Sequence, residues 1–200
     1  MSNLKETILN PILKGNPITV LVLGICSSLA VTVQLKGALV MALSVTIVTG
    51  LSSLVVSLLR NTIPNRVRII VQLVVVAMIV ILVDQMLKAY AYAIDKQLSV
   101  YIGLIITNCI VMGRIEAFAL GNKPIPSLLD GLANGVGYGL ILIIVAFFRE
   151  LLGSGTLLGM RVLPAGYIPN NLVILPPFAL ILLGCIIWVH RACDKELQEK

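Results

Sequence analysis

Charged side chains are scarce in this sequence. Asp, Glu, Lys and Arg together make up 12% of its 200 residues, whereas 58% of the residues are hydrophobic. So few polar groups cannot cover the surface of a water-soluble core, while a bilayer supplies an apolar solvent for the remaining side chains. We therefore predict an all-α integral membrane protein with the lipid bilayer as its environment.

The sequence also lacks the motifs of common nucleotide-dependent and hydrolytic enzymes. It contains no phosphate-binding loop, no dinucleotide fingerprint and no hydrolytic triad. The net charge of +6 could suggest nucleic acid, but the basic residues lie mostly in short connections between apolar runs, as topology signals do. We expect no nucleic-acid partner and no catalytic residue in the chain.

Six apolar segments are candidate membrane spans. They comprise residues 18–33, 37–59, 67–87, 98–112, 128–148 and 172–189. A spanning helix takes roughly 20 residues, so the first and fourth segments are short. Both also contain residues that loosen a helix: Gly24, Ser27 and Ser28 in the first, and Thr107, Asn108 and Gly113 in the fourth. These two helices are predicted to be short or broken.

Each short segment carries one cysteine, Cys26 in the first and Cys109 in the fourth. Thiolates are soft ligands that hold iron–sulfur clusters, and such clusters usually take four of them. Two cysteines are therefore half of such a site. A lone cysteine in a membrane helix is usually only a small apolar side chain, and this is our interpretation of Cys185 and Cys193.

The positions of the two short segments indicate an internal repeat. Paired short or interrupted hydrophobic segments in two halves of a chain are typical of repeats with a site at the membrane midplane. Three spans per half is an odd number, so the second half must enter from the opposite side of the membrane. We predict one membrane domain over residues 1–200, with inverted three-helix repeats at about 10–93 and 94–193.

The basic residues predict the orientation. With six spans, ten of them lie on one side: Lys5, Lys14, Arg60, Arg66, Arg68, Arg114, Lys123, Arg191, Lys195 and Lys200. The other side holds Lys36, Lys88, Lys96, Arg149 and Arg161. The positive-inside rule then places both termini in the cytoplasm.

Two further patterns have a structural interpretation. Asp84 and Lys88 are four residues apart near the end of a span, where a helix brings the two side chains together as an ion pair. A proton or cation site at Asp84 is the alternative, because carboxylates within membranes are often functional. Gly131, Gly135 and Gly139 recur every four residues and predict a close-packing helix face.

Several stretches of the chain resemble a known family. They are Asn16-Pro17, residues 23–32 (LGICSSLAVT), 63–70 (IPNRVRII), 83–90 (VDQMLKAY), 107–118 (TNCIVMGRIEAF) and 148–155 (FRELLGSG). Together they resemble the family of membrane proteins that contains the D and E subunits of bacterial Na⁺-translocating NADH:quinone reductases and their Rnf counterparts. The resemblance covers nearly the whole chain, and residues 83–90 favour the D subunits.

The resemblance implies a more specific function than the composition and motifs of the chain indicate. Family members are six-helix inner-membrane subunits of a six-subunit complex, in which the D subunit pairs with the homologous E subunit of opposite topology, beside the A, B, C and F subunits. The cysteines matching Cys26 and Cys109 join two cysteines of the E subunit in holding an intramembrane 2Fe–2S cluster. NADH and flavins are bound by other subunits, and electron transfer to ubiquinone is coupled to sodium export. The chain would not be active alone.

Two alternatives remain at this point. The first is the E subunit of an Rnf-type ferredoxin:NAD oxidoreductase, which shares the Thr107–Arg114 element. The second, from another class, is a secondary transporter with an inverted repeat, whose broken helices would line a substrate site. Such a transporter would function without iron and would need further polar side chains at the break.

Overall fold

The described structure is almost entirely helical. The computed structural model describes residues 15–64, 66–90, 103–157, 160–161 and 171–193. In chain order its helices are α2 (Ile25–Val31), α3 (Leu35–Leu59), α4 (Arg68–Tyr90), α6 (Cys109–Arg114), the π-helix η1 (Ile115–Ala119), α7 (Pro124–Ser154), α8 (Asn171–Ile174) and α9 (Pro176–Cys193). A small antiparallel hairpin, β1 (Thr156–Leu157) and β2 (Met160–Arg161), follows α7. The predicted all-α class is confirmed.

Among the described helices, three are long and apolar enough to cross a membrane. They are α3, α7 and most of α4, and α9 is a shorter apolar helix. These four correspond to the second, fifth, third and sixth predicted spans. Some of the predicted features lie outside the described residues. They are the beginning of the fourth predicted span, the side chain of Cys193, and the tails and connection that carry Lys5, Lys14, Lys96, Lys195 and Lys200.

The two short predicted spans are broken, as expected. Residues 17–21 form turns, and α2 begins only at Ile25, after two left-handed residues, Val22 with φ of 57° and Gly24 with φ of 83°. In the fourth segment a helical stretch at 103–106 stops at Thr107, and α6 begins at Cys109. Both cysteines therefore lie in the first turn after a break.

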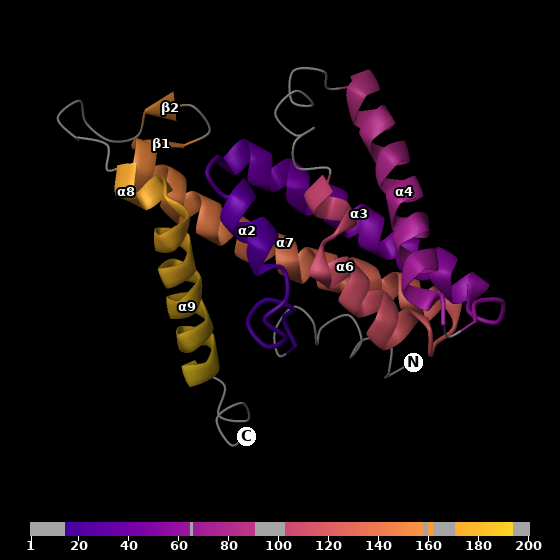
Figure 1. The fold of residues 1–200 in the computed structure, drawn as a ribbon. Helices are drawn as coiled ribbons and strands as arrows, with labels where there is room; N and C mark the ends of the chain where they lie inside the picture. The colour runs from indigo at the N-terminus through magenta and orange to yellow at the C-terminus, as the bar shows by residue number, and fades with distance from the viewer. Residues whose placement is uncertain (1–14, 65, 91–102, 158–159, 162–170, 194–200) are drawn as a thin grey trace.

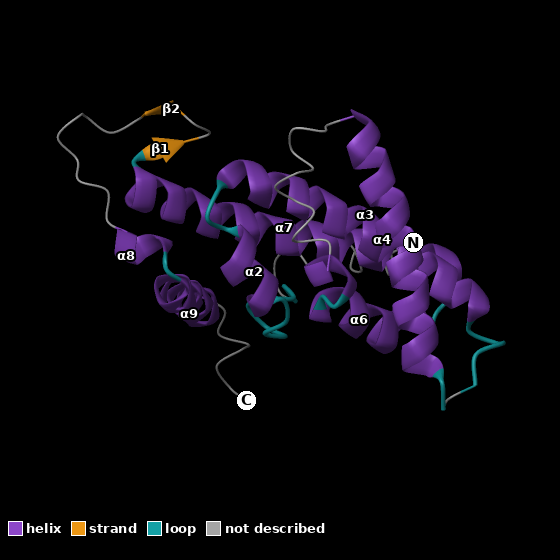
Figure 2. Ribbon diagram, turned by 45° about the horizontal axis from the view of Figure 1, so that its top comes forward, coloured by secondary structure: helices purple, strands orange, loops and turns teal. Residues whose placement is uncertain are grey.

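The helices α3 and α7 form an antiparallel pair at the centre of the molecule (Figure 1). Figures 1 and 2 show α4 and α9 at opposite ends of this pair, with α2 and α6 lying across it between them. Large apolar side chains point outward from the end helices, for example Ile70 on α4 and Trp188 on α9, which are 63% and 73% exposed. Such faces suit a lipid environment.

The predicted glycine stripe is the contact surface between α7 and α3. A Cβ atom added to Gly135 would lie 2.6 Å from the Thr46 Cα, and one added to Gly131 would lie 2.8 Å from the Thr49 carbonyl oxygen. Gly139 faces Ala42 in the same way. Small residues let the two backbones approach closely, which is the main source of helix association within a bilayer.

We expect Gly135→Ala to lower the thermal stability of the detergent-solubilised protein, by roughly 1 to 3 kcal/mol, because the added methyl group collides with the α3 backbone. Size-exclusion chromatography after heating measures this loss. Gly184→Ala is the matched control, since Gly184 is also helical but has no atom within 4 Å of its added Cβ. Equal melting temperatures for the two variants would contradict the packing argument.

Candidate functional site

Cys26 lies on a short helix that begins at a glycine. Gly24 is the N-cap residue of α2 and adopts a left-handed conformation that side chains other than glycine rarely adopt. An added Cβ atom there would also lie 2.6 Å from Ile110 Cδ1 and 3.0 Å from Tyr138 Cε2. Glycine is thus required at this position both for the turn and for close approach to the second break. The side chain of Cys26 is exposed.

Cys109 is the first residue of α6. Its preceding residue, Asn108, caps the helix, because its Oδ1 accepts a hydrogen bond from the Ile110 N–H at 3.2 Å. An Asn cap satisfies one of the free N–H groups that a helix start leaves. The Cys109 side chain is half-buried.

The two breaks meet, although they lie in distant parts of the chain. The backbone N–H of Gly24 donates a hydrogen bond to the Cys109 Sγ at 3.0 Å. The two thiol groups lie side by side, close enough to interact directly. The structure thus brings together the two residues that the sequence marks as half of a metal site.

A buried polar network joins the two cysteine turns. The Ser27 Oγ donates to the Gly24 carbonyl oxygen at 3.0 Å and lies 2.6 Å from the Tyr138 hydroxyl on α7. It also accepts a hydrogen bond from Asn108 Nδ2, at 3.4 Å. Ser27, Asn108 and Tyr138 are fully buried. Each cysteine therefore has a neighbour in the chain that belongs to this network.

Arg149 holds the far end of the Cys26 helix. Its guanidinium donates to the Leu29 carbonyl oxygen at 3.0 Å, to the Thr32 Oγ1 at 2.6 Å, and to carbonyl oxygens of Val173 and Ile174 on α8. The arginine is fully buried within α7. Arg149 thus supplies a donor for a carbonyl group at the end of α2, where the helix itself has no N–H to offer.

A comparable contact joins α3 to the connection that follows α6 and η1. Ser57 and Arg60, at the end of α3, both donate to the Asn122 carbonyl oxygen, at 2.7 Å and 2.8 Å. The neighbour of Arg149, Glu150, accepts the N–H of Leu35 at the start of α3 at 2.6 Å. Arg60 at the end of α3 and Arg149 within α7 therefore each bind backbone beyond the other half's cysteine.

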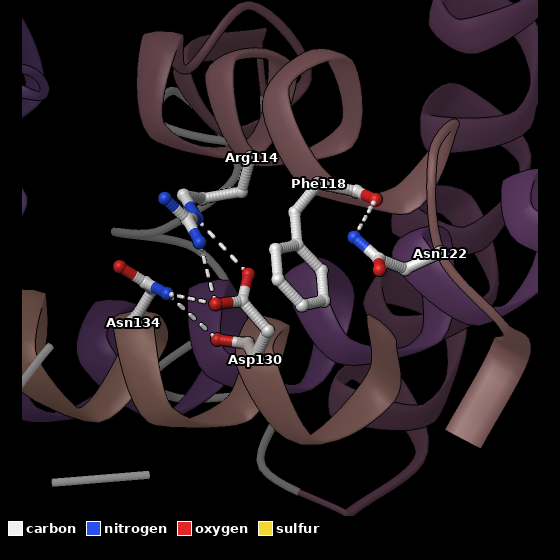
Figure 3. Close-up of polar contacts among 5 residues, drawn as sticks. All are labelled: Arg114, Phe118, Asn122, Asp130 and Asn134. Atoms are coloured by element: carbon white, nitrogen blue, oxygen red, sulfur yellow. Dashed lines mark hydrogen bonds and ion pairs between the residues drawn. The ribbon is translucent and has the colours of Figure 1, made fainter. Parts of the chain in front are cut away.

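A buried ion pair attaches α6 to α7. Figure 3 shows Arg114 reaching toward Asp130, with Asn134 on the same side of α7. Arg114 Nε donates to Asp130 Oδ2 at 3.0 Å, and its second bond goes to Oδ1, which also accepts from Asn134 at 3.1 Å. The arginine also lies over the Phe118 ring, 5.7 Å from the centroid. Charges within a membrane protein require such pairing.

These contacts correct the interpretation of two arginines as topology signals. The sequence suggests that Arg114 and Arg149 lie in connections between spans, but Arg114 lies in α6 and Arg149 lies inside α7. Arginines within helices that bond to neighbouring helices do not report orientation. Removing one from each side leaves nine basic residues against four, so the direction of the bias is unchanged. The apolar residues around each arginine in the sequence could have indicated that these arginines lie within helices.

The remaining predicted residues lie away from the cysteine pair. Lys88 Nζ contacts Asp84 Oδ2 at 2.6 Å, which confirms the predicted ion pair. Cys185 is exposed on α9. Within the described ranges, three or more His, Cys, Asp or Glu side chains do not gather at any one place as a metal site would require. The chemistry that the cysteine pair offers is therefore that of two soft ligands.

Comparisons with known proteins agree over the full length of the chain. The family model described as "Rnf-Nqr subunit, membrane protein" matches residues 4–187. A protein of Aeromonas salmonicida, named as the D subunit of a Na(+)-translocating NADH-quinone reductase, is 56% identical over 205 residues, covering 100% of this chain and 98% of the relative. A D subunit from Haemophilus influenzae is 58% identical over 201 residues, covering 98% and 97% respectively.

We expect Arg149→Ala to lower the free energy of unfolding by about 3 kcal/mol, because several buried oxygens on α2 and α8 lose their charged donor. Arg149→Lys should restore part of it, since an ammonium can still reach one or two of these oxygens. The melting temperature of the solubilised protein measures both effects. Lys36→Ala, at an exposed position, is the control. An unchanged melting temperature in Arg149→Ala would contradict this role.

Proposed function

This chain belongs to the Rnf-Nqr family of membrane subunits, and from that membership we propose that it is the D subunit of a bacterial Na⁺-translocating NADH:quinone reductase. The relatives named as D subunits are matched from end to end at 56–58% identity. The activity of this chain is that of the complex, in which the A, B, C, E and F subunits bind NADH and flavins and complete the route to ubiquinone.

The cysteine pair is the single observation that carries the proposed redox role. Cys26 and Cys109 are brought side by side from two distant segments, and Cys26 is exposed. Two neighbouring thiolates, one exposed and one half-buried, fit half of the four-thiolate ligand set of an iron–sulfur cluster. The homologous E subunit would supply the remaining two cysteines across the interface. When bound, a 2Fe–2S cluster supplies a one-electron redox group within the apolar layer.

The residues around the pair have separate tasks in this proposal. The Gly24 N–H donates to one ligand sulfur, and Asn108 fixes the start of the helix that carries the same cysteine. Arg149 and Arg60 hold the far ends of the two cysteine segments. The electron-transfer centre is therefore mounted on two short helices that are bonded to the rigid α3–α7 pair. Electron transfer through this region is coupled, in the complex, to sodium export.

We infer six spans in two inverted repeats. The antiparallel α3–α7 pair supports this, since each is the long helix that follows a cysteine segment. The reciprocal arginine contacts, from α3 to the Cys109 segment and from α7 to the Cys26 segment, also relate the halves. A second chain of the same build, inserted the other way up, would present its own cysteine pair to this one.

The transporter alternative is disfavoured by the polar groups at the breaks. A substrate site needs polar groups that are free to bind a ligand. Ser27, Asn108 and Tyr138 are instead fully buried and bonded to one another. The Rnf alternative is disfavoured because the relatives at 56–58% identity are named as D subunits of NADH-quinone reductases.

The cysteines can be tested in the whole complex. We expect Cys26→Ala or Cys109→Ala to abolish the intramembrane iron signal and quinone reduction, while NADH oxidation with an artificial acceptor survives because it lies upstream. Iron content, spectroscopy and the two activities are the measurements. Cys185→Ala, on the exposed face of α9, is the matched control and should behave like wild type. Normal quinone reduction by an assembled Cys26→Ala complex would refute the proposed role.

The orientation gives a second test. Both termini are expected in the cytoplasm of a bacterial inner membrane, because the basic residues are concentrated on that side. A green fluorescent protein fused after Lys200 should fluoresce, and an alkaline phosphatase fused there should be inactive. An active phosphatase fusion would reverse the proposed topology without affecting the cysteine chemistry.

A further inference from the structure

One assignment of protons satisfies all three hydrogen-bond contacts of Ser27. A serine hydroxyl carries one proton and two acceptor lone pairs. Its Oγ lies 3.0 Å from the Gly24 carbonyl oxygen, which can only accept, so the proton goes there. The Asn108 amide group can only donate to the Oγ. The Tyr138 hydroxyl at 2.6 Å is then the second donor, and Ser27 is fully satisfied.

This arrangement holds Gly24 from two sides. Its carbonyl oxygen is bonded to Ser27, and its N–H is bonded to the Cys109 Sγ. With φ of 83° and ψ of 15°, the glycine is in a conformation from which small rotations would turn the N–H away from the sulfur. Tyr138, anchored in the long helix α7, is the external group that fixes Ser27 in place.

The N–H bond to sulfur has an electrostatic consequence for a bound cluster. Hydrogen bonds to ligand sulfurs are one of the factors that set the reduction potential of iron–sulfur centres. A donor favours the state with more negative charge on sulfur, which is the reduced state. The Gly24 N–H therefore raises the potential, and its loss makes the potential more negative.

We propose that Tyr138 is a positioning residue for the redox centre: through Ser27, its hydroxyl holds the Cys26 turn in register with Cys109 and maintains the N–H bond that sets the reduction potential. This inference rests on the proposed function, because it presumes that Cys26 and Cys109 are cluster ligands. Tyr138 acts through Ser27 and Gly24. It is not a ligand itself.

The serine pair on α2 provides a matched control. Ser27 and Ser28 are adjacent, and both are fully buried. The Ser28 hydroxyl donates only within its own helix, to the Ile25 carbonyl oxygen at 2.7 Å. Ser27→Ala and Ser28→Ala thus each remove one hydroxyl from the same helix, but only Ser27→Ala removes the hydrogen bonds that join α2 to Asn108 and Tyr138.

The first readout needs no cluster. The full chain, carrying Cys185→Ala and Cys193→Ala, is produced in membranes without its partner and oxidised with copper phenanthroline, and the Cys26–Cys109 disulfide is followed by maleimide labelling. We expect Tyr138→Phe and Ser27→Ala to slow disulfide formation by about threefold to tenfold, the range that one net hydrogen bond represents. Ser28→Ala should match the parent chain.

The second readout is a redox titration of the intramembrane iron signal in the whole complex. Tyr138→Phe and Ser27→Ala should shift the midpoint to more negative potential with iron content unchanged. The double variant Ser27→Ala/Tyr138→Phe leaves no buried hydroxyl unpaired, and only the Asn108 amide loses a partner, as it already does in Ser27→Ala. The double variant should therefore assemble about as well as Ser27→Ala and show the same shift. If Tyr138→Phe assembles poorly, the midpoint potential of the double variant still tests the role of Tyr138.

The outcomes separate the two proposals. If the parent complex shows no iron signal that depends on Cys26 and Cys109, the proposed function fails, while the disulfide rates still test the positioning of the two turns. If the signal is present but Tyr138→Phe and the double variant titrate like Ser28→Ala, the role of Tyr138 is overturned and the proposed function stands.

Discussion

The need to satisfy backbone polar groups in an apolar solvent governs this structure. A helix that spans a bilayer satisfies its own N–H and C=O groups, but a helix broken at Gly24 or Asn108 does not. The free groups are bonded by side chains from elsewhere: Arg149 binds carbonyl oxygens after Cys26, and Arg60 binds one after Cys109. The buried charge of Arg149 is thus explained by the break that it compensates.

The close approach of α3 and α7 makes these contacts possible. Glycine at 131, 135 and 139 lets the backbones of the two long helices touch, and their antiparallel direction places Arg60 and Arg149 at opposite ends of the pair. Arg149 then reaches the short helix α2 of the first half, and Arg60 reaches the chain beyond α6 and η1 in the second half. The close packing of α3 and α7 therefore supports the two helix breaks. It also holds the turns that carry Cys26 and Cys109 against each other.

The candidate site has a buried polar part and an exposed thiol, that of Cys26. Ser27, Asn108 and Tyr138 bond to one another beneath the cysteines, while Cys26 is exposed beside Cys109. Buried polar networks whose members are all satisfied specify a single geometry. An exposed pair of soft ligands on such a support suits a centre completed by a second protein chain, which is the assembly that the proposed function requires.

The sequence by itself determined the membrane environment, the helical class, the two helix breaks and the marking of Cys26 and Cys109, because composition, segment length and helix-loosening residues are local properties. It also predicted the glycine packing face and the Asp84–Lys88 pair, which depend on helical periodicity alone. Only the tertiary structure decided that Gly24 bonds to Cys109 and that Tyr138 joins the two turns. It also decided that Arg114 pairs with Asp130 and that Arg149 is buried inside α7, so that neither lies in a connection. These contacts join residues far apart in the chain or depend on which partner is near, and no periodicity within one segment encodes them.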